Sequence, residues 1–379
     1  MRDPPEASCI GLVRGNYFMS DTMIDSDSQH DDRTLSVDLP RDPANPVLVE
    51  VTRGSMVESR HRGSVAVVDV TGKIALRWGD TDTPVLPRSA IKAIQALPLV
   101  ESGAADAFSI SDAELAIACA SHSGEPRHVA TVRGWLERMG LGEDDLECGA
   151  HWPRHHRQSL HDMIRAGEEP GPAHNNCSGK HTGMLATAHH LGETLGGYVA
   201  PTHGVQQRIL GTLEALCGLD LGDAPRGTDG CSVPTWGIPL ANLALAFARI
   251  GAPDDSLPPE RAAAATRIRK AVAAHPEMVA GTGRYCTVMM AAAGESIFVK
   301  TGAEGVFCAA LPEYGLGVAL KCDDGAARAA QMMLTAVLRR IGVLDDALAA
   351  TLDSLVTVSI ETINGRVVGA IRPSNELGF

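Results

Sequence analysis

The pattern of hydrophobic and polar positions gives this chain strand-like ends and a helix-like middle. Near the start, residues 65–70, a Thr71-Gly72 turn and residues 73–76 predict a β-hairpin. Near the end, residues 356–371 predict a second hairpin folded about Asn364-Gly365, a pair typical of the type I′ turn. Two more strands are predicted before this hairpin, at residues 296–299 and 315–320.

The middle of the chain has the apolar period of amphipathic helices. Ser111 and Glu114 have the spacing of a capping box, which predicts a helix running toward Cys119. Similar periods predict four more helices, at residues 204–217, 238–250, 259–274 and about 325–341. Because terminal strands surround a helical middle without βαβ alternation, we predict an α+β fold. Its antiparallel sheet is built from the N- and C-terminal strands.

The first 46 residues differ from the rest. They are rich in Asp, Ser, Arg and Pro and have no sustained period, so we predict a disordered N-terminal extension over residues 1–46. Residues 47–379 are predicted to form the catalytic domain, with a sheet lobe and a helical lobe. The chemistry should therefore begin after the extension.

Composition and charge restrict the class of partner. With 44% hydrophobic and 21% charged residues, the 379-residue chain can bury a large core. Its formal net charge of -13 opposes a phosphate backbone, and no basic run interleaved with aromatics offsets this, so we expect no nucleic-acid partner. No apolar stretch approaches the roughly 20 residues that cross a bilayer, and no signal peptide is evident. We expect a cytoplasmic protein with no membrane partner and, among its nine cysteines, no disulfides.

The first candidate for chemistry is the pair Ser89 and Lys92, which follows Pro87 at the start of a helical run. Residues three apart lie about one turn apart on one helix face, so the ammonium could reach the hydroxyl. A lysine can take the serine proton if burial or a nearby charge such as Arg88 lowers the lysine pKa. The alternative is an ordinary helix N-terminus whose lysine extends to solvent.

Two further segments fit the same chemistry. Lys300-Thr301-Gly302 leaves a predicted strand and matches the KTG element that accompanies SxxK in penicillin-recognising serine enzymes. Ser121 lies in a polar segment just after the capped helix, where it could meet Lys300. Each also has a plain structural interpretation, as a strand ending in a turn and as a solvated loop.

The cysteine thiols and histidine imidazoles of the chain are candidate metal ligands. Cys177, with Lys180 nearby, and Cys231 together indicate a metal site, although the CxxC pairs of structural zinc sites are missing and buried free cysteines remain the alternative. The cluster His151, His155 and His156 is interrupted by Pro153, which argues against a helix, so we predict a surface loop there and give the cluster no role.

Taken together, these segments resemble the L-asparaginase II family, the rhizobial-type asparaginases. The resemblance covers about residues 47 to the C-terminus. Its motifs occur in the family's order, at residues 57–63, 88–92, 119–123, 176–181, 228–231, 275–281 and 283–286.

The resemblance implies a fold akin to serine β-lactamases and penicillin-binding proteins, and hydrolysis of L-asparagine to L-aspartate and ammonia. Matched motif by motif, it implies two Ser–Lys pairs, Ser89 with Lys92 and Ser121 with Lys300. It places a zinc site at Cys177, Lys180 and Cys231. We expect Ser89 to be the nucleophile, with Ser121 and Lys300 relaying protons, although the reverse order stays open. We also expect a homodimer.

Two other functions remain open. The first is a glutaminase or another serine amidohydrolase of the same fold, which would differ only in the shape of its pocket. The second is a non-catalytic zinc-binding module in which Cys177 and Cys231 are structural and the serines are idle. Assays of asparagine beside glutamine and a chromogenic β-lactam separate the first possibility. Unfolding on metal removal, with no ammonia release from the metal-bound form, would favour the second.

Overall fold

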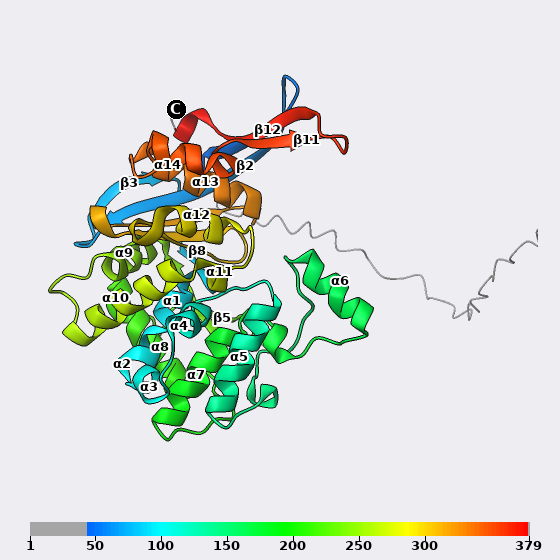
Figure 1. Cartoon of the computed structure of the whole chain (residues 1–379). Coiled ribbons are helices and arrows are strands. Elements are labelled where there is room, and N and C mark those ends of the chain that lie inside the picture. Colours follow the sequence, from blue (N-terminus) through cyan, green and yellow to red (C-terminus); the bar gives the residue numbers. More distant parts are fainter. Residues whose placement is uncertain (1–43, 378–379) are drawn as a thin grey trace, which may run out of the picture. The chain divides into compact units, whose positions relative to one another are not determined.

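The computed structural model describes residues 44–377 (Figure 1). The predicted disordered extension lies outside the described residues as far as residue 43, and the described residues belong to one compact unit. Within this part of the chain, no helix is long and apolar enough to cross a membrane. The eight cysteines of these residues are all buried free thiols.

The strands join the two ends of the chain in one antiparallel sheet. Its order is β11-β12-β1-β2-β10-β9-β8, and β3 also pairs with β2. The short pairs β4-β7 and β5-β6 lie outside it. The strands are β1 (Val47–Arg53), β2 (Met56–Asp69), β3 (Ile74–Trp78), β4 (Pro84–Val85), β5 (Arg226–Thr228), β6 (Pro234–Trp236), β7 (Ile238–Pro239), β8 (Phe298–Thr301), β9 (Val306–Leu311), β10 (Leu316–Cys322), β11 (Val358–Glu361) and β12 (Val367–Pro373).

This arrangement confirms the predicted α+β class. The pairing of β1 with β12, with Val51 opposite Ile371, brings the terminal strands together as the sequence indicated. Strand β9 was missed because all six of its residues are buried, which removes the alternation that reveals a half-exposed strand.

The C-terminal hairpin is confirmed, but its predicted turn type is wrong. A type I′ turn needs a positive φ at both central residues. Gly365 has a φ of 83°, whereas Asn364 is not among the described residues with positive φ. Gly365 N donates to Thr362 O at 2.9 Å, and Thr362 N donates to Arg366 O at 2.9 Å. The connection is therefore a type I turn followed by a left-handed glycine.

Helices occupy most of residues 92–293, and a second group of helices follows strand β10. The predicted helices at 204–217 and 259–274 are confirmed at those bounds, and those near 112–118, 240–251 and 327–340 within a few residues. The α-helices are α1 (Lys92–Gln95), α2 (Leu97–Glu101), α3 (Ala104–Ala107), α4 (Asp112–Ala118), α5 (Pro126–Arg138), α6 (Arg157–Ala166), α7 (Ser178–His190), α8 (Gly204–Cys217), α9 (Leu240–Gly251), α10 (Pro259–Ala274), α11 (Pro276–Val279), α12 (Tyr285–Ala293), α13 (Ala327–Arg340), α14 (Asp346–Thr351) and α15 (Asp353–Val356).

Short 3₁₀ turns connect these elements. They are η1 (Arg88–Ile91), η2 (Glu143–Asp145), η3 (Pro172–His174), η4 (Gly294–Ser296), η5 (Pro312–Tyr314) and η6 (Asn375–Leu377).

Helices cover both faces of the central strands (Figure 1). Helix α9 lies so close to β10 that a Cβ atom at Gly317 would clash with the α9 backbone. On the opposite face, Gly63 of β2 lies against Met333 of α13. Because side chains alternate along a strand, each sheet residue points either toward α9 or toward α13. This alternation decides on which side each functional side chain lies.

Candidate functional site

Ser121 lies between two buried lysines. Its Oγ is 3.0 Å from Lys92 Nζ and 3.0 Å from Lys300 Nζ. Ser121 is 5% exposed, and the two lysines are 0% and 1% exposed. The three residues come from distant parts of the chain, so the fold itself assembles this group. The hydrogen bond between Ser121 and Lys300 is the contact that the sequence motifs implied.

Lys300 points into the site because of its place in β8. Phe298 stacks on Phe247 of α9, with ring centroids 6.1 Å apart, so Phe298 faces the α9 side of the sheet. Lys300 is two residues further on and therefore points to the same side. Its Nζ also donates to Thr301 O at 2.9 Å. The lysine thus leaves the strand edge in a fixed direction.

Ser121 is held through its backbone. The chain leaves α4, whose N-terminus has the predicted capping box between Ser111 and Glu114. Ser121 N donates to Val279 O at 2.9 Å, and Arg284 donates to Ser121 O. Since both backbone polar groups are bonded, the hydroxyl has a defined position relative to the lysines.

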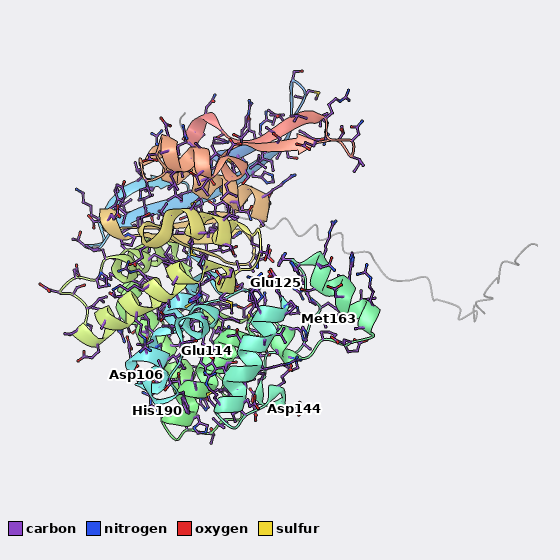
Figure 2. All side chains as sticks on the ribbon, in the orientation of Figure 1. Asp106, Glu114, Glu125, Asp144, Met163 and His190 are labelled. Atoms are coloured by element: carbon purple, nitrogen blue, oxygen red, sulfur yellow. The ribbon has the colours of Figure 1, made fainter. Side chains whose placement is uncertain are left out.

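Glu125 anchors the end of the same polar segment (Figure 2). Its carboxylate accepts from Thr282 N at 2.7 Å and from Thr282 Oγ1 at 2.9 Å. These bonds tie the Ser121 loop to the segment that precedes α12. A hollow of about 480 Å³ is lined by Gly124 of this loop and by Met163 of α6, among other residues.

Lys92 begins α1 directly after the η1 turn. Its ammonium donates to Ala120 O, to Asn176 O at 3.4 Å and to Cys177 Sγ at 3.1 Å, in addition to Ser121. A buried ammonium needs such partners because desolvation is costly. These bonds fix Lys92 where the motif segments 119–123 and 176–181 meet.

Arg88 opens the η1 turn in a strained conformation. Its φ of 52° lies in the left-handed region, which non-glycine residues rarely adopt. Its guanidinium donates to Asp229 Oδ1 from two nitrogens, at 2.8 and 3.0 Å. Strain of this kind persists only where the surroundings enforce it. The ion pair therefore connects the Ser89 turn to the Cys231 loop.

Ser89 lies half-buried in η1, and its hydroxyl makes no hydrogen bond within residues 44–377. Residues three apart in a 3₁₀ turn share a face, as expected from their spacing. The Lys92 ammonium nevertheless bonds to Ser121 and not to Ser89. The role of Ser89 as nucleophile stays a prediction.

The electrostatic environment favours a neutral Lys300. Burial lowers its pKa from 10.5 to about 7, and the charges of Lys92 and Arg284 act in the same direction. Near neutral pH a substantial fraction of Lys300 is therefore an unprotonated amine. Such an amine can accept the proton of the Ser121 hydroxyl.

The fold also brings together the three residues implied as metal ligands. Lys180 Nζ lies 3.1 Å from Cys231 Sγ, and Cys177 and Cys231 hydrogen-bond to each other. All three residues are nearly fully buried. The hydrogen bond from Cys231, assisted by Lys92 and Lys180, holds the pKa of Cys177 well below its usual value despite burial.

This group has the donor chemistry of a soft divalent ion. Burial opposes the charge of Lys180, but Cys231, Cys177 and Asp229 outweigh it and raise the Lys180 pKa. The pKa of Cys231 is raised by its hydrogen bond to Cys177 and by burial. A metal would therefore have to displace protons from Cys231 and Lys180, which makes binding dependent on pH. Two thiolates and an amine fit zinc.

The predicted histidine loop is present. The segment from His151 to His155 is not helical, and His151 Nε2 accepts from Asn176 N at 3.0 Å. His156 caps α6 by accepting from Ser159 N. Arg284 and Asp229 have no predicted role, although both lie in the family's motifs at residues 283–286 and 228–231. Their positions inside those motifs were the available signal.

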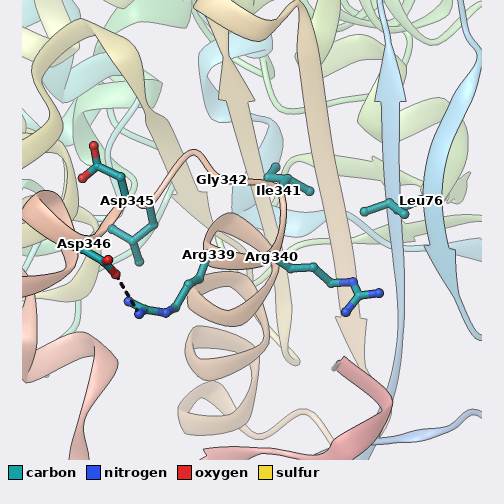
Figure 3. Close-up of a pocket in the computed structure, with 8 residues that line it drawn as sticks. Leu76, Arg339, Arg340, Ile341, Gly342, Asp345 and Asp346 are labelled. Atoms are coloured by element: carbon teal, nitrogen blue, oxygen red, sulfur yellow. Dashed lines mark hydrogen bonds and ion pairs between the residues drawn. The ribbon is translucent and has the colours of Figure 1, made fainter. Parts of the chain in front are cut away.

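A surface hollow of about 710 Å³ lies away from Ser121 (Figure 3). Its wall is formed by the C-terminal end of α13, the turn that follows, and Leu76 of β3. Arg339 on this wall pairs with Asp346 at 3.1 Å. The hollow contains none of the predicted site residues.

Comparison with known proteins gives one family and several distant structures. The L-asparaginase II family model matches residues 49–373. Comparison with curated proteins finds no match. The chain is similar to a β-lactamase from Mycobacterium bovis, with 16% identity, coverage of 73% of this chain and 94% of that chain, and a TM-score of 0.38.

Two other solved structures are similar at the same level. The native form of Mglu has 14% identity, coverage of 72% of this chain and 62% of that chain, and a TM-score of 0.38. The D-alanine carboxypeptidase AmpC from Burkholderia cenocepacia has 12% identity, coverage of 72% and 93%, and a TM-score of 0.34. The family match includes every residue of the site described above.

Proposed function

The chain belongs to the L-asparaginase II family, and from this we propose that it hydrolyses L-asparagine to L-aspartate and ammonia. The observation that supports the proposal most strongly is the placement of Ser121 Oγ at 3.0 Å from both Lys92 and Lys300. A hydroxyl between two amines, one with a pKa near 7, can pass a proton in either direction. Hydrolysis of an amide needs both directions.

We assign the attack to Ser89. It is half-buried and so can meet a substrate, whereas Ser121 is 5% exposed and already bonded to two lysines. In the first step, Ser89 Oγ bonds to the side-chain amide carbon and gives its proton to Lys92, while Lys92 gives one to Ser121 and Ser121 gives one to the neutral amine of Lys300. The carbon–nitrogen bond then breaks, and one proton returns through the same groups to the departing ammonia.

The second step releases the product. Water attacks the acyl group on Ser89, and the lysine network accepts the proton of the water. The bond between the acyl carbon and Ser89 breaks, and the proton returns to the serine oxygen. L-Aspartate leaves and the enzyme is regenerated. The whole cycle uses only side chains of this chain and one water molecule.

We further propose that Cys177, Lys180 and Cys231 hold zinc. Bound there, zinc would supply a positive charge beside the contact between Cys177 and Lys92. Among the residues of this chain, Asp229 orients Arg88 through their ion pair and thereby positions the turn that contains Ser89. The homodimer and the cytoplasmic location stay predictions, and sedimentation of the purified protein tests the first.

The test is hydrolysis by the purified full-length protein, measured in parallel as ammonia release from L-asparagine and L-glutamine and as the colour change of a chromogenic β-lactam. We expect release from asparagine, little of it in Ser121→Ala, and near wild-type release in the matched control Ser123→Ala. Preference for glutamine would change the substrate and keep the reaction class. No turnover of any of the three substrates would overturn the proposal and favour the zinc-binding module.

A further inference from the structure

A second group of metal-binding side chains lies on the α13 side of the sheet. His61 is on β2, Cys322 ends β10, and Asp324 lies in the connection to α13. Cys322 is the cross-strand partner of Gly63, which contacts α13, and His61 is two residues before Gly63. Both side chains therefore point to the α13 side of the sheet. Lys300 and Ser121 belong to the other side.

Both other members of the group hydrogen-bond to the Asp324 carboxylate. His61 Nδ1 lies 2.6 Å from Asp324 Oδ2, and the Cys322 thiol donates to Asp324 Oδ1 at 3.0 Å. One nitrogen, one sulfur and one oxygen atom of the three residues all lie within 4.8 Å of one another. In the part of the chain that the structure describes, this is the one group of three or more His, Cys, Asp or Glu residues with such spacing.

Burial distinguishes the group from a chance surface cluster. His61 is 5% exposed and Cys322 is 0% exposed, whereas the side chain of Asp324 is 48% exposed. Nδ1 of His61 faces Asp324, so it is the ring nitrogen that would bind an ion together with the carboxylate. The other ring nitrogen, Nε2, is buried without a hydrogen-bond partner among residues 44–377, but it points away from Asp324 and adds nothing to the site.

We propose that His61, Cys322 and Asp324 bind a divalent transition-metal ion of the zinc class, at a site separate from Cys177, Lys180 and Cys231. Imidazole, thiolate and carboxylate together suit zinc and its neighbours. Three protein ligands leave one position for water on the exposed side of Asp324. One thiolate and one carboxylate balance the charge of the ion.

Binding replaces protons with the metal. Burial opposes ionisation of Asp324, but bonds from Cys322, Ala326 N and His61 outweigh it and lower the Asp324 pKa to about 2. Burial, with the neighbouring Asp324 charge, raises the pKa of the Cys322 thiol to about 12. The ion must therefore displace the thiol proton, which is released to solvent as the sulfur–metal bond forms.

The movement required of Asp324 is small. Tetrahedral coordination at about 2.0–2.3 Å places ligand atoms roughly 3.3–3.7 Å apart, so Asp324 has to move back by less than about 1 Å. Its exposed position permits this shift. The ion would join β2, the end of β10 and the start of α13, so it would stabilise the folded sheet by binding only to the native state.

The experiment counts metal on the full chain. Metal-free protein is titrated with Co²⁺ and Zn²⁺, and bound metal is measured by elemental analysis together with the thiolate-to-Co²⁺ absorption. We expect two equivalents in the wild type and one in Cys322→Ser. The control Cys217→Ser, another buried thiol outside both groups, should keep two. Asp324→Asn should also lose one equivalent, which keeps the test valid if Cys322→Ser folds poorly.

The experiment distinguishes failure of the His61 site from failure of the zinc site proposed at Cys177, Lys180 and Cys231. If Cys177→Ser leaves metal content unchanged while Cys322→Ser lowers it, the Cys177 site fails and the His61 site stands. Equal stoichiometry and equal thiolate absorption in wild type, Cys322→Ser and Asp324→Asn would overturn the inference. Metal binding that does not depend on Cys322 or Asp324 would overturn the inference as well.

Discussion

Cys177 Sγ lies 3.1 Å from Lys92 Nζ, so the proposed metal ligands and the Ser–Lys network touch directly. The negative charge of the Cys177 thiolate also acts on Lys300, whose pKa it raises against the larger lowering by burial. A change in the charge of Cys177 therefore reaches both lysines that bond to Ser121. The two sites form one electrostatic unit.

The first prediction concerns the two serines. Ser89→Ala and Ser121→Ala should each lower kcat by about 10²–10⁴-fold, the usual contribution of a group that transfers a proton or begins nucleophilic attack. Circular dichroism should show an unchanged fold. Ser123→Ala should retain activity, because Ser123 Oγ donates to Ala280 O and contacts neither lysine. Near wild-type turnover in either of the first two variants would exclude that serine from the mechanism.

Mass spectrometry of the quenched reaction separates the roles of the two serines. We expect an aspartyl group on the peptide that contains Ser89 and none on the peptide that contains Ser121. The reverse result would make Ser121 the nucleophile and Ser89 the accessory group. The Ser–Lys network would stand in both cases.

Local signals in the sequence predicted the helices well. The 204–217 and 259–274 periods give α8 and α10 because each presents an apolar face and ends at a clear breaker or cap, such as Gly218 after α8. Strand β9 has no such signal, since it is buried on both faces. The turn at Asn364 was misread because two turn types accept an Asn-Gly pair when the loop length is unknown.

Sequence motifs predicted only part of the site. Spacing alone could place Ser89 near Lys92, but the direction of the Lys92 ammonium depends on acceptors 28 to 85 residues away in sequence. The contact of Ser121 with Lys300 spans 179 residues. Only the resemblance to a family connected such distant residues. The His61 group was not predicted because its members give no local motif.

The second prediction concerns pH. Because burial lowers the Lys300 pKa to about 7, the amine is protonated below that pH and cannot accept a proton. The rate should rise as pH increases through about 7, well below the value near 10.4 of a free lysine. Lys300→Arg should lose activity at every pH, since a guanidinium stays charged. Lys321→Arg on β10 is the control. A rate that peaks near pH 5 and falls through pH 8 would indicate a carboxylate base.

The third prediction concerns metal at Cys177. Cys177→Ala and Cys231→Ala should each lose one equivalent of zinc relative to wild type, because thiolates supply most of the affinity for a borderline-soft ion. Cys217→Ala should lose none. Elemental analysis measures the change. Zinc content that is the same in all four proteins would rule out this ligand set, and turnover that survives chelation would make the metal structural.

The last prediction concerns Arg284, which donates to the backbone oxygens of Ser121 and Ala280 and is largely buried. Arg284→Met removes the bond that positions Ser121. A charge-assisted hydrogen bond contributes about 1.5–3 kcal/mol, so kcat should fall by about 10–100-fold. Its charge also lowers the Lys300 pKa, so the pH at which the rate rises should shift upward in this variant.

Two further variants separate positioning by Arg284 from a general loss of structure. Arg284→Lys keeps the charge and should recover most of the original pH midpoint, with partial recovery of kcat because a compact ammonium does not reproduce the planar guanidinium geometry. Arg127→Met removes a nearby charge that contacts Thr282 and not Ser121, so it should leave the midpoint in place. Rate profiles across pH 5 to 10, roughly spanning both the lowered and the ordinary lysine pKa, provide the measurement. An unchanged midpoint in Arg284→Met would show that Arg284 acts on the fold and not on Lys300.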